Sequence, residues 1–389
     1  MIPYGKQNIT NEDIESVLSV LKSDFLTQGP ITPEFERELS SYCGSKHSVA
    51  VVNATAALHL ACIALEVGPS DLVWTSPISF VASANCAKYC GADVDFVDID
   101  PVTYNMSTES LEAKLEAAAL NGKLPKVVIP VHLSGQSCDM KKIKSLSLKY
   151  GFKIIEDASH AIGGEYMGNK IGSCEFSDIT VFSFHPVKII TTCEGGVCMT
   201  NNFELFENMY NNRSHGILRS NNNFKNKSDG GWYYEQQSLG FNYRLNDLQS
   251  ALGISQLKRI DEFIKERNDI AKKYDQLFEG VDGITTPKIN NNCLSSYHLY
   301  IIRIDQNKLE ERNLIFEKLR NNGILVNIHY IPIYRQPYYQ NDYNKANFIN
   351  SENYYSEALS LPIFPGLTES QINEVFNAIV KKANFQNLF

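Results

Sequence analysis

Short apolar runs alternate with longer amphipathic segments over the first part of the chain. A short apolar run predicts a buried strand, and apolar residues spaced by three and four predict a helix. On this basis strands are predicted at 48–52, 72–75, 94–97, 126–131, 153–156 and 179–182. Helices are predicted at 10–22, 33–42, from 53 or 54 onward, at 107–120, 139–150 and 202–213. This alternation favours an α/β fold with a mostly parallel sheet and helices on both faces.

The pattern changes toward the C-terminus. A long helix is predicted to open within 239–249 and to continue to about residue 274. Beyond it the pattern predicts strands at 297–302 and 325–327, helices at 309–321, 351–359 and 368–383, a Tyr-rich loop at 330–343 and a turn from 361. We therefore expect a large domain over 1–250, which includes a helical segment at 1–45. A long linking helix and a small α+β domain would occupy 251–389.

Composition excludes several classes of protein. The formal net charge of −8 argues against a nucleic-acid-binding surface. The N-terminus has no apolar signal core, and no apolar run is long enough to span a membrane, so a cytoplasmic location is expected. The nine cysteines form no Cys-x-x-Cys pair, which favours reduced thiols and no metal site.

The strongest chemical signal is Lys188, which lies between the apolar run at 179–182 and the apolar pair at 189–190. A lysine in such a dry pocket can act as a neutral amine and form a Schiff base. Upstream, Asp157 ends another apolar run and His160 follows it. Pyridoxal phosphate needs a lysine for its aldehyde and a carboxylate for its pyridine nitrogen, so this pair predicts a site for that cofactor. The alternative is a surface lysine and a capping aspartate.

Other side chains follow predicted strands and would share the same edge of the sheet. Asn53 and Thr55 begin a helix, whose free N–H groups can bind an anion, although Asn53 could be an ordinary cap. Phe80 could stack on a flat ring or lie in the core. His132 could be functional or a satisfied buried histidine, and His160 could merely bond to the backbone. The polar segment 220–237 is a candidate mobile lid.

Taken together, several motifs resemble the DegT/DnrJ/EryC1/StrS family of sugar aminotransferases, which have the fold-type-I architecture of pyridoxal phosphate enzymes. The motifs are Asp157 with His160, Ser183-x-His185-x-x-Lys188, Glu194-Gly195-Gly196 and Asn242-Tyr243-Arg244. The resemblance covers essentially the whole chain. Segments at 75–82, 182–185, 213–216 and 356–362 most resemble one branch, the transaminases of pseudaminic acid biosynthesis. Cys193 departs from the glycine or alanine of many relatives, and no catalytic group is lost.

The resemblance implies roles for individual residues. Lys188 would hold the cofactor as a Schiff base and then act as a base, Asp157 would pair with the pyridine nitrogen, and His160 would lie near the phenolic oxygen. The other cofactor contacts implied are stacking by Phe80 and phosphate binding by Ala54, Thr55, Ser183 and, from a partner subunit, Asn242. That last contact implies a homodimer with shared active sites. The substrate-binding residues implied are Tyr4, Lys6, Thr27, Gln28, Gly29, His185, Arg244 and Tyr330.

The resemblance also implies a reaction. L-Glutamate would donate an amino group, leaving 2-oxoglutarate, and the acceptor would be the C4 ketone of UDP-2-acetamido-2,6-dideoxy-β-L-arabino-hex-4-ulose, a UDP-4-keto-6-deoxy-N-acetylhexosamine. One alternative is a different UDP-4-keto sugar, such as the bacillosamine precursor or the 4-amino-arabinose precursor. The other is a cofactor-binding sensor or scaffold without turnover.

Overall fold

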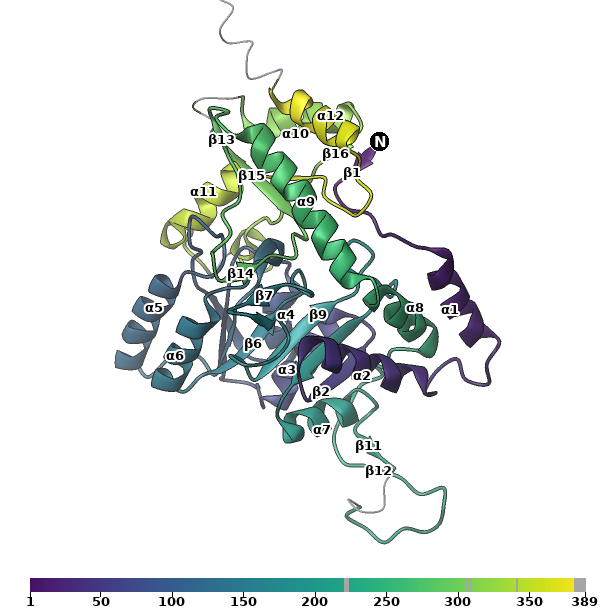
Figure 1. Cartoon of the computed structure of the whole chain (residues 1–389). Helices are drawn as coiled ribbons and strands as arrows, with labels where there is room; N and C mark the ends of the chain where they lie inside the picture. Colours follow the sequence, from purple (N-terminus) through teal and green to yellow (C-terminus); the bar gives the residue numbers. More distant parts are fainter. Residues whose placement is uncertain (220–223, 306, 308–309, 341, 381–389) are drawn as a thin grey trace, which may run out of the picture.

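A seven-stranded sheet forms the centre of the molecule (Figure 1). The computed structural model describes residues 1–380 apart from 220–223, 306, 308–309 and 341. In spatial order the strands are β2 (His47–Val51), β10 (Gly196–Thr200), β9 (Ile179–Ser183), β6 (Lys153–Asp157), β5 (Val127–Ile129), β3 (Leu72–Thr75) and β4 (Asp93–Phe96). β10 is antiparallel to both of its neighbours, and the other pairs are parallel. The prediction of a mostly parallel α/β sheet is confirmed.

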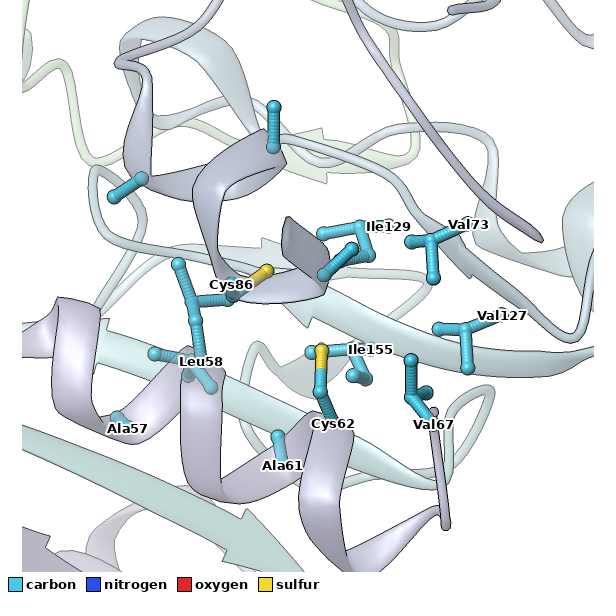
Figure 2. Packing of buried hydrophobic residues seen from close by; sticks show 14 of the residues in the cluster. Ala57, Leu58, Ala61, Cys62, Val67, Val73, Cys86, Val127, Ile129 and Ile155 are labelled. Carbon is cyan, nitrogen blue, oxygen red and sulfur yellow. The ribbon is translucent and has the colours of Figure 1, made fainter. Parts of the chain in front are cut away.

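Side chains alternate between the two faces of this sheet, as the two-residue period of a strand requires. On β5, Val127 and Ile129 join the apolar cluster beneath one set of helices, whereas Val128 joins the cluster on the opposite face. Figure 2 shows the first cluster, in which Cys62 lies beside Ile155 of β6 and Leu58 lies beside Cys86. Because both faces are covered, strands such as β3, β5 and β9 consist mainly of apolar residues.

Helices cover both faces of the sheet. One face is covered by α3 (Ala54–Ala64), α4 (Ala82–Tyr89) and α7 (Phe203–Asn212). The opposite face is covered by α5 (Thr108–Leu120), α6 (Met140–Tyr150), α2 (Ile31–Cys43), α8 (Asp247–Leu257) and the start of α9 (Ile260–Phe278). α1 (Asn11–Leu21) packs on α8.

A second apolar core forms around the C-terminal elements. Its antiparallel sheet consists of β13 (Ile284–Thr285), β15 (Tyr300–Ile304) and β17 (Ala358–Leu361), and its helices include α10 (Arg312–Asn321) and α12 (Glu369–Val380). α11 (Ile349–Glu357) packs on β15 through a separate apolar cluster that contains Tyr354. β1 (Ile2–Pro3) pairs with β16 (Ile324–Leu325), so the N-terminus lies among these elements (Figure 1). β14 (Cys293–Leu294) pairs with β7 (Glu165–Tyr166), which pairs with β8 (Asn169–Lys170). The domain division at residue 250 stays a prediction.

The prediction of one long helix from the 240s to residue 274 is wrong, because α8 ends at Leu257 and α9 begins at Ile260. The break contains neither glycine nor proline, so local sequence does not show it. Arg259, at the break, donates to Asp13 Oδ2 at 2.6 Å and to Asn8 Oδ1 at 3.0 Å. A tertiary contact with the N-terminal segment therefore holds the chain where the helix is interrupted.

Two smaller predictions also need correction. The strand predicted at 297–302 begins only at Tyr300, because Tyr297 has a φ of 45° and Ser296 N–H and Leu299 N–H donate to the carbonyls of Gly135 and Ser134. The turn predicted from residue 361 follows a strand that was not predicted, β17, which pairs with β15. The last part of the helix predicted at 368–383 lies outside the described residues.

The polar segment predicted as a lid forms an arm that extends from the body of the molecule (Figure 1). β11 (Ile217–Leu218) and β12 (Glu235–Gln236) pair at its base. Residues 220–223 lie outside the described residues. The carboxylate of Glu235 accepts the backbone N–H groups of Lys225 and Asn226, both at 2.7 Å. The described part of the segment is thus organised around Glu235, and its motion as a lid stays a prediction.

The described residues show neither a membrane-spanning helix nor a metal-binding cluster. None of the helices in the described part of the chain combines the length and the apolar character that crossing a membrane requires. All nine cysteines carry free thiols. Within the same described ranges, His, Cys, Asp and Glu side chains form no group that could hold a metal ion.

A buried ion pair ties α2 and the end of α7 to the sheet. Arg213, 6% exposed, donates to Glu36, 8% exposed, and to the carbonyl of Ala50 at 2.8 Å. Removing one partner leaves an uncompensated buried charge, so Arg213→Met is expected to lower the free energy of unfolding by about 3–5 kcal/mol. Urea denaturation would measure this loss. The double variant Glu36→Gln/Arg213→Met should lose clearly less, and equal losses would contradict the explanation.

Candidate active site

Several predicted site residues meet at one edge of the central sheet. Asp157 ends β6, Ser183 ends β9, and Asn53 lies between β2 and α3. Because these three strands run in the same direction, their carboxyl ends share an edge, which is where ligands bind in open α/β sheets. Phe80 follows β3 at the same edge, and Lys188 lies in the loop between β9 and β10.

Asp157 is held by two hydroxyl groups. It is 4% exposed, and its Oδ2 accepts a hydrogen bond from Ser83 Oγ at 2.6 Å. Its Oδ1 accepts from Ser159 Oγ at 2.6 Å and from the Ser159 N–H at 3.2 Å. Sequence reasoning missed Ser83, although Ser79 and Ser83 stand four residues apart directly after a strand and share a hydrogen bond of 2.6 Å. The carboxylate is thereby fixed in one orientation.

Lys188 has the properties of a reactive amine. It is half-buried, and burial lowers its pKa to about 8, against the opposing effect of the Asp157 charge. Near neutral pH a useful fraction of this side chain is therefore uncharged, whereas an ordinary lysine has a pKa of about 10.4.

The lowered pKa of Lys188 predicts how the rate of binding of pyridoxal phosphate, the expected cofactor, depends on pH. Only the neutral amine attacks an aldehyde, so binding to the unloaded protein should accelerate with pH up to about 8 and then level off. Stopped-flow absorbance between pH 6 and 10 would measure the rate. Nα-acetyl-lysine, the control, should continue to accelerate to about pH 10.4. A protein rate that follows the control would contradict a desolvated Lys188.

His160 is uncharged in this site. It is 5% exposed, and its Nδ1 accepts the N–H of Ser134 at 3.3 Å, so Nε2 carries the proton and donates to Tyr330 Oη at 3.0 Å. Burial, Lys188 and His329 hold the pKa of His160 well below its ordinary value. Burial and Lys188 likewise lower the pKa of His329 to about 3. His329, which sequence reasoning missed, precedes Tyr330 directly.

The N-terminus of α3 offers donors for an anion. Asn53 caps the helix through its side chain, which accepts the Ala56 N–H at 2.8 Å. Among the described residues, the N–H groups of Ala54 and Thr55 have no acceptor. A Cβ on Gly196 would lie 2.6 Å from Ala54 N, so this close approach of β10 needs glycine. The arrangement fits a phosphate group.

Two further residues fit a cofactor with a flat ring and a phosphate. Phe80 is 59% exposed although Ile78 and Ser79 before it are buried, and its ring centroid lies 6.3 Å from that of Tyr330. The Ser183 hydroxyl, at the end of β9, makes no hydrogen bond within the described ranges. Asn242 is exposed and pairs through its backbone with Ser214. The cofactor roles of these residues stay predictions.

The predicted substrate residues fall into two groups. Tyr4 packs on His329 with ring centroids 5.1 Å apart, so it lies near Lys188, and Lys6 and His185 are exposed. Gln28 and Arg244 line a separate pocket of about 720 Å³ whose lining does not include Lys188.

Thr27 and Gly29 flank Gln28. Thr27 is exposed. A Cβ on Gly29 would lie 2.2 Å from Asp247 Oδ2, so this glycine has a packing role as well.

His132 lies outside this constellation. Its Nε2 is 2.7 Å from Glu156 Oε2, and its Nδ1 accepts the Cys138 N–H at 3.2 Å. Ser177 and Thr180 also donate to Glu156. His132 is thus a satisfied buried histidine, one of the two alternatives left open by its sequence.

Comparisons with known proteins agree with this arrangement. The model of the DegT/DnrJ/EryC1/StrS aminotransferase family matches residues 7–380. The UDP-4-amino-4,6-dideoxy-N-acetyl-β-L-altrosamine transaminase of Campylobacter jejuni is 39% identical over 362 residues, 93% of this chain and 92% of the relative. The structure of Helicobacter pylori PseC, an aminotransferase of pseudoaminic acid biosynthesis, is 34% identical, with a TM-score of 0.88 and 98% of both chains covered. Spr1654 of Streptococcus pneumoniae in its PMP form is 30% identical, with a TM-score of 0.89 and 98% and 99% covered.

Proposed function

Because the chain belongs to the DegT/DnrJ/EryC1/StrS aminotransferase family, whose members use pyridoxal phosphate, we propose that it transfers an amino group from L-glutamate to the C4 ketone of a UDP-linked 4-keto-6-deoxy-N-acetylhexosamine. The acceptor we infer is UDP-2-acetamido-2,6-dideoxy-β-L-arabino-hex-4-ulose, on the pathway to pseudaminic acid. The likeness to the Campylobacter transaminase and to PseC supports this choice. The observation that carries the chemistry is a desolvated lysine beside a fixed, buried carboxylate.

The residues of the site suit distinct tasks. Bound pyridoxal phosphate supplies an electron sink for the carbon that loses its proton. Asp157, fixed by Ser83 and Ser159, would keep the proton on the pyridine nitrogen. Lys188 would hold the aldehyde carbon and, when free, move a proton at its Nζ between carbons.

The remaining groups would position and shield. The N–H groups of Ala54 and Thr55, with the Ser183 hydroxyl, would bind the phosphate, and Phe80 would cover the ring. Tyr330, which accepts from His160, keeps its own O–H proton free to donate to a ligand oxygen.

We further propose a homodimer in which Asn242 reaches the neighbouring phosphate site, and a cytoplasmic location. The exposure of Asn242 and the arm beyond it supports a contact with a second chain: Trp232 is 79% and Tyr234 is 53% exposed. Sedimentation equilibrium should give twice the mass of one chain. Mixing Asn242→Ala with Lys188→Ala subunits should restore activity in hybrids that hold one intact site. A monomer with full activity would overturn the shared site.

The proposed reaction is tested first by absorption spectroscopy. The purified protein should show the visible band of bound pyridoxal phosphate, and L-glutamate should convert it to the ultraviolet band of the pyridoxamine form. UDP-2-acetamido-2,6-dideoxy-β-L-arabino-hex-4-ulose should then restore the visible band faster than the bacillosamine precursor does. A protein that stays colourless with pyridoxal phosphate would overturn the function, and a preference for the bacillosamine precursor would overturn the acceptor.

A further inference from the structure

A third buried imidazole, that of His298, packs against His160. The two ring centroids are 4.3 Å apart and the ring planes meet at 48°. His298 is 3% exposed, and its Nδ1 is buried without a hydrogen-bond partner among the described residues. The ring is therefore placed by packing and by its backbone, and not by hydrogen bonds of its own.

The backbone of His298 is held by a buried arginine. Arg267 on α9 is 1% exposed, and its Nη1 lies 3.1 Å from the Tyr297 carbonyl, 3.4 Å from the His298 carbonyl and 3.0 Å from the Ile363 carbonyl. In the described part of the chain it forms no ion pair with a carboxylate. Its Nη1 group thus fixes the segment that carries His298.

The same segment is joined to the surroundings of His160. Ser296 Oγ donates to the His160 carbonyl at 2.8 Å, and the Leu299 N–H donates to the Ser134 carbonyl at 3.3 Å. Ser134 is the residue whose N–H binds His160 Nδ1. One segment before β15 therefore places His298 and also supports the backbone donor that selects the tautomer of His160.

The protonation state of His160 decides these contacts. A protonated His160 would carry hydrogen on Nδ1 and point it at the Ser134 N–H, which would break that bond. The titratable groups that face His160 are Lys188 from the β9–β10 loop, His329 and Tyr330 after β16, and His298. Arg267 approaches the His298 backbone. Asp157, at the end of β6, is bound to hydroxyls instead. Beyond the Tyr330 phenol, the surroundings of His160 are cationic or neutral.

We propose that His298 is a positioning residue that covers His160 and keeps it in the uncharged tautomer that donates to Tyr330. The effect is one of shape and burial: the ring of His298 excludes water from His160 without bringing a carboxylate near it. This role is independent of which sugar the protein accepts. It rests on the proposed function only where turnover is measured.

Three substitutions separate this role from a merely structural one. His298→Phe keeps a flat ring, so His160 should remain uncharged, and loss of the unpartnered nitrogen should raise the melting temperature. His298→Ala admits water, so the pKa of His160 should rise toward about 6.5. His298→Asp adds a carboxylate and should raise it further.

The readout is an NMR titration of histidine nitrogens in the protein without cofactor. The chain has only eight histidines, so the signals that are missing from the spectrum of His160→Asn identify His160. In the enzyme loaded with cofactor, the transamination rate should fall at acid pH. The pH of this fall should rise in the order His298→Phe, His298→Ala, His298→Asp. Wild-type titration of His160 in the Ala variant would overturn the proposal, as would a wild-type His160 protonated on Nδ1 at neutral pH; the Asp variant shows that the titration reports on this position. His298→Asn replaces His298→Ala if the latter unfolds. If the proposed function is wrong, the protein will show no turnover, but the NMR titration will still test the role of His298.

Discussion

Lys188→Ala is expected to abolish multiple-turnover transamination, with a loss of at least about 10⁴-fold, the scale of removing a central catalytic group. Among the lysines that the structure describes at this strand edge, Lys188 alone combines partial burial with a pKa of about 8, so no second amine there could replace it. Release of 2-oxoglutarate over many turnovers, with L-glutamate and the keto-sugar acceptor both present, would measure the loss.

The control for Lys188→Ala is Lys141→Ala, since Lys141 is exposed on α6. That variant should retain wild-type rates and a wild-type spectrum. Lys188→Ala should still bind pyridoxal phosphate, but the absorbance maximum should not shift as it does when the cofactor bonds covalently to the protein. If Lys188→Ala turned over repeatedly at more than about one-hundredth of the wild-type rate, the role assigned to Lys188 would be wrong.

Asp157→Asn is expected to lower the rate of both half-reactions by about 10²–10³-fold, the cost of losing one electrostatic contact that acts in the transition state. The amide oxygen can replace Oδ1 and accept from Ser159, and the amide NH₂ can donate to the Ser83 hydroxyl, so the fold should persist. The amide would not hold a proton on the pyridine nitrogen, and the electron sink would weaken. Pre-steady-state absorbance changes with glutamate would measure the effect.

A matched control stands next to Asp157 on the same strand. Glu156 is also buried, but its hydrogen bonds to His132, Ser177 and Thr180 have a structural role. Glu156→Gln should lower the free energy of unfolding by about 1–3 kcal/mol and leave the half-reaction rates of the folded protein nearly unchanged. If the two variants behaved alike, the chemistry could not be assigned to Asp157.

Much of the fold could be predicted because local patterns are dominated by burial. Each strand of the central sheet except β10 corresponds to an apolar run that the pattern singled out, and the helices between them follow the three-and-four spacing. β10 was missed because it has only three apolar residues, Val197, Cys198 and Met199, after two glycines, and β17 was missed because it follows α11 with no intervening turn. The break between α8 and α9 was missed for a different reason, since a contact of Arg259 with Asp13 holds it.

The candidate site shows the same division. Residues at strand ends, such as Asp157 and Lys188, were identifiable because their place in the sheet follows from the strands before them. His298 and His329 were not, because they come from the C-terminal core and reach the site only when that core packs on the central sheet.

By itself, the sequence determined the strand–helix order, the resemblance to the sugar aminotransferases and the identity of the chemical groups at the strand ends. Only the tertiary structure decided the environment of those groups. It buried Lys188 enough to lower its pKa, surrounded Asp157 with hydroxyls, and set the tautomer of His160 through Ser134. The physical reason is that residue type and local pattern are properties of neighbours in the chain. Desolvation and hydrogen bonding depend on segments that folding brings together from far apart.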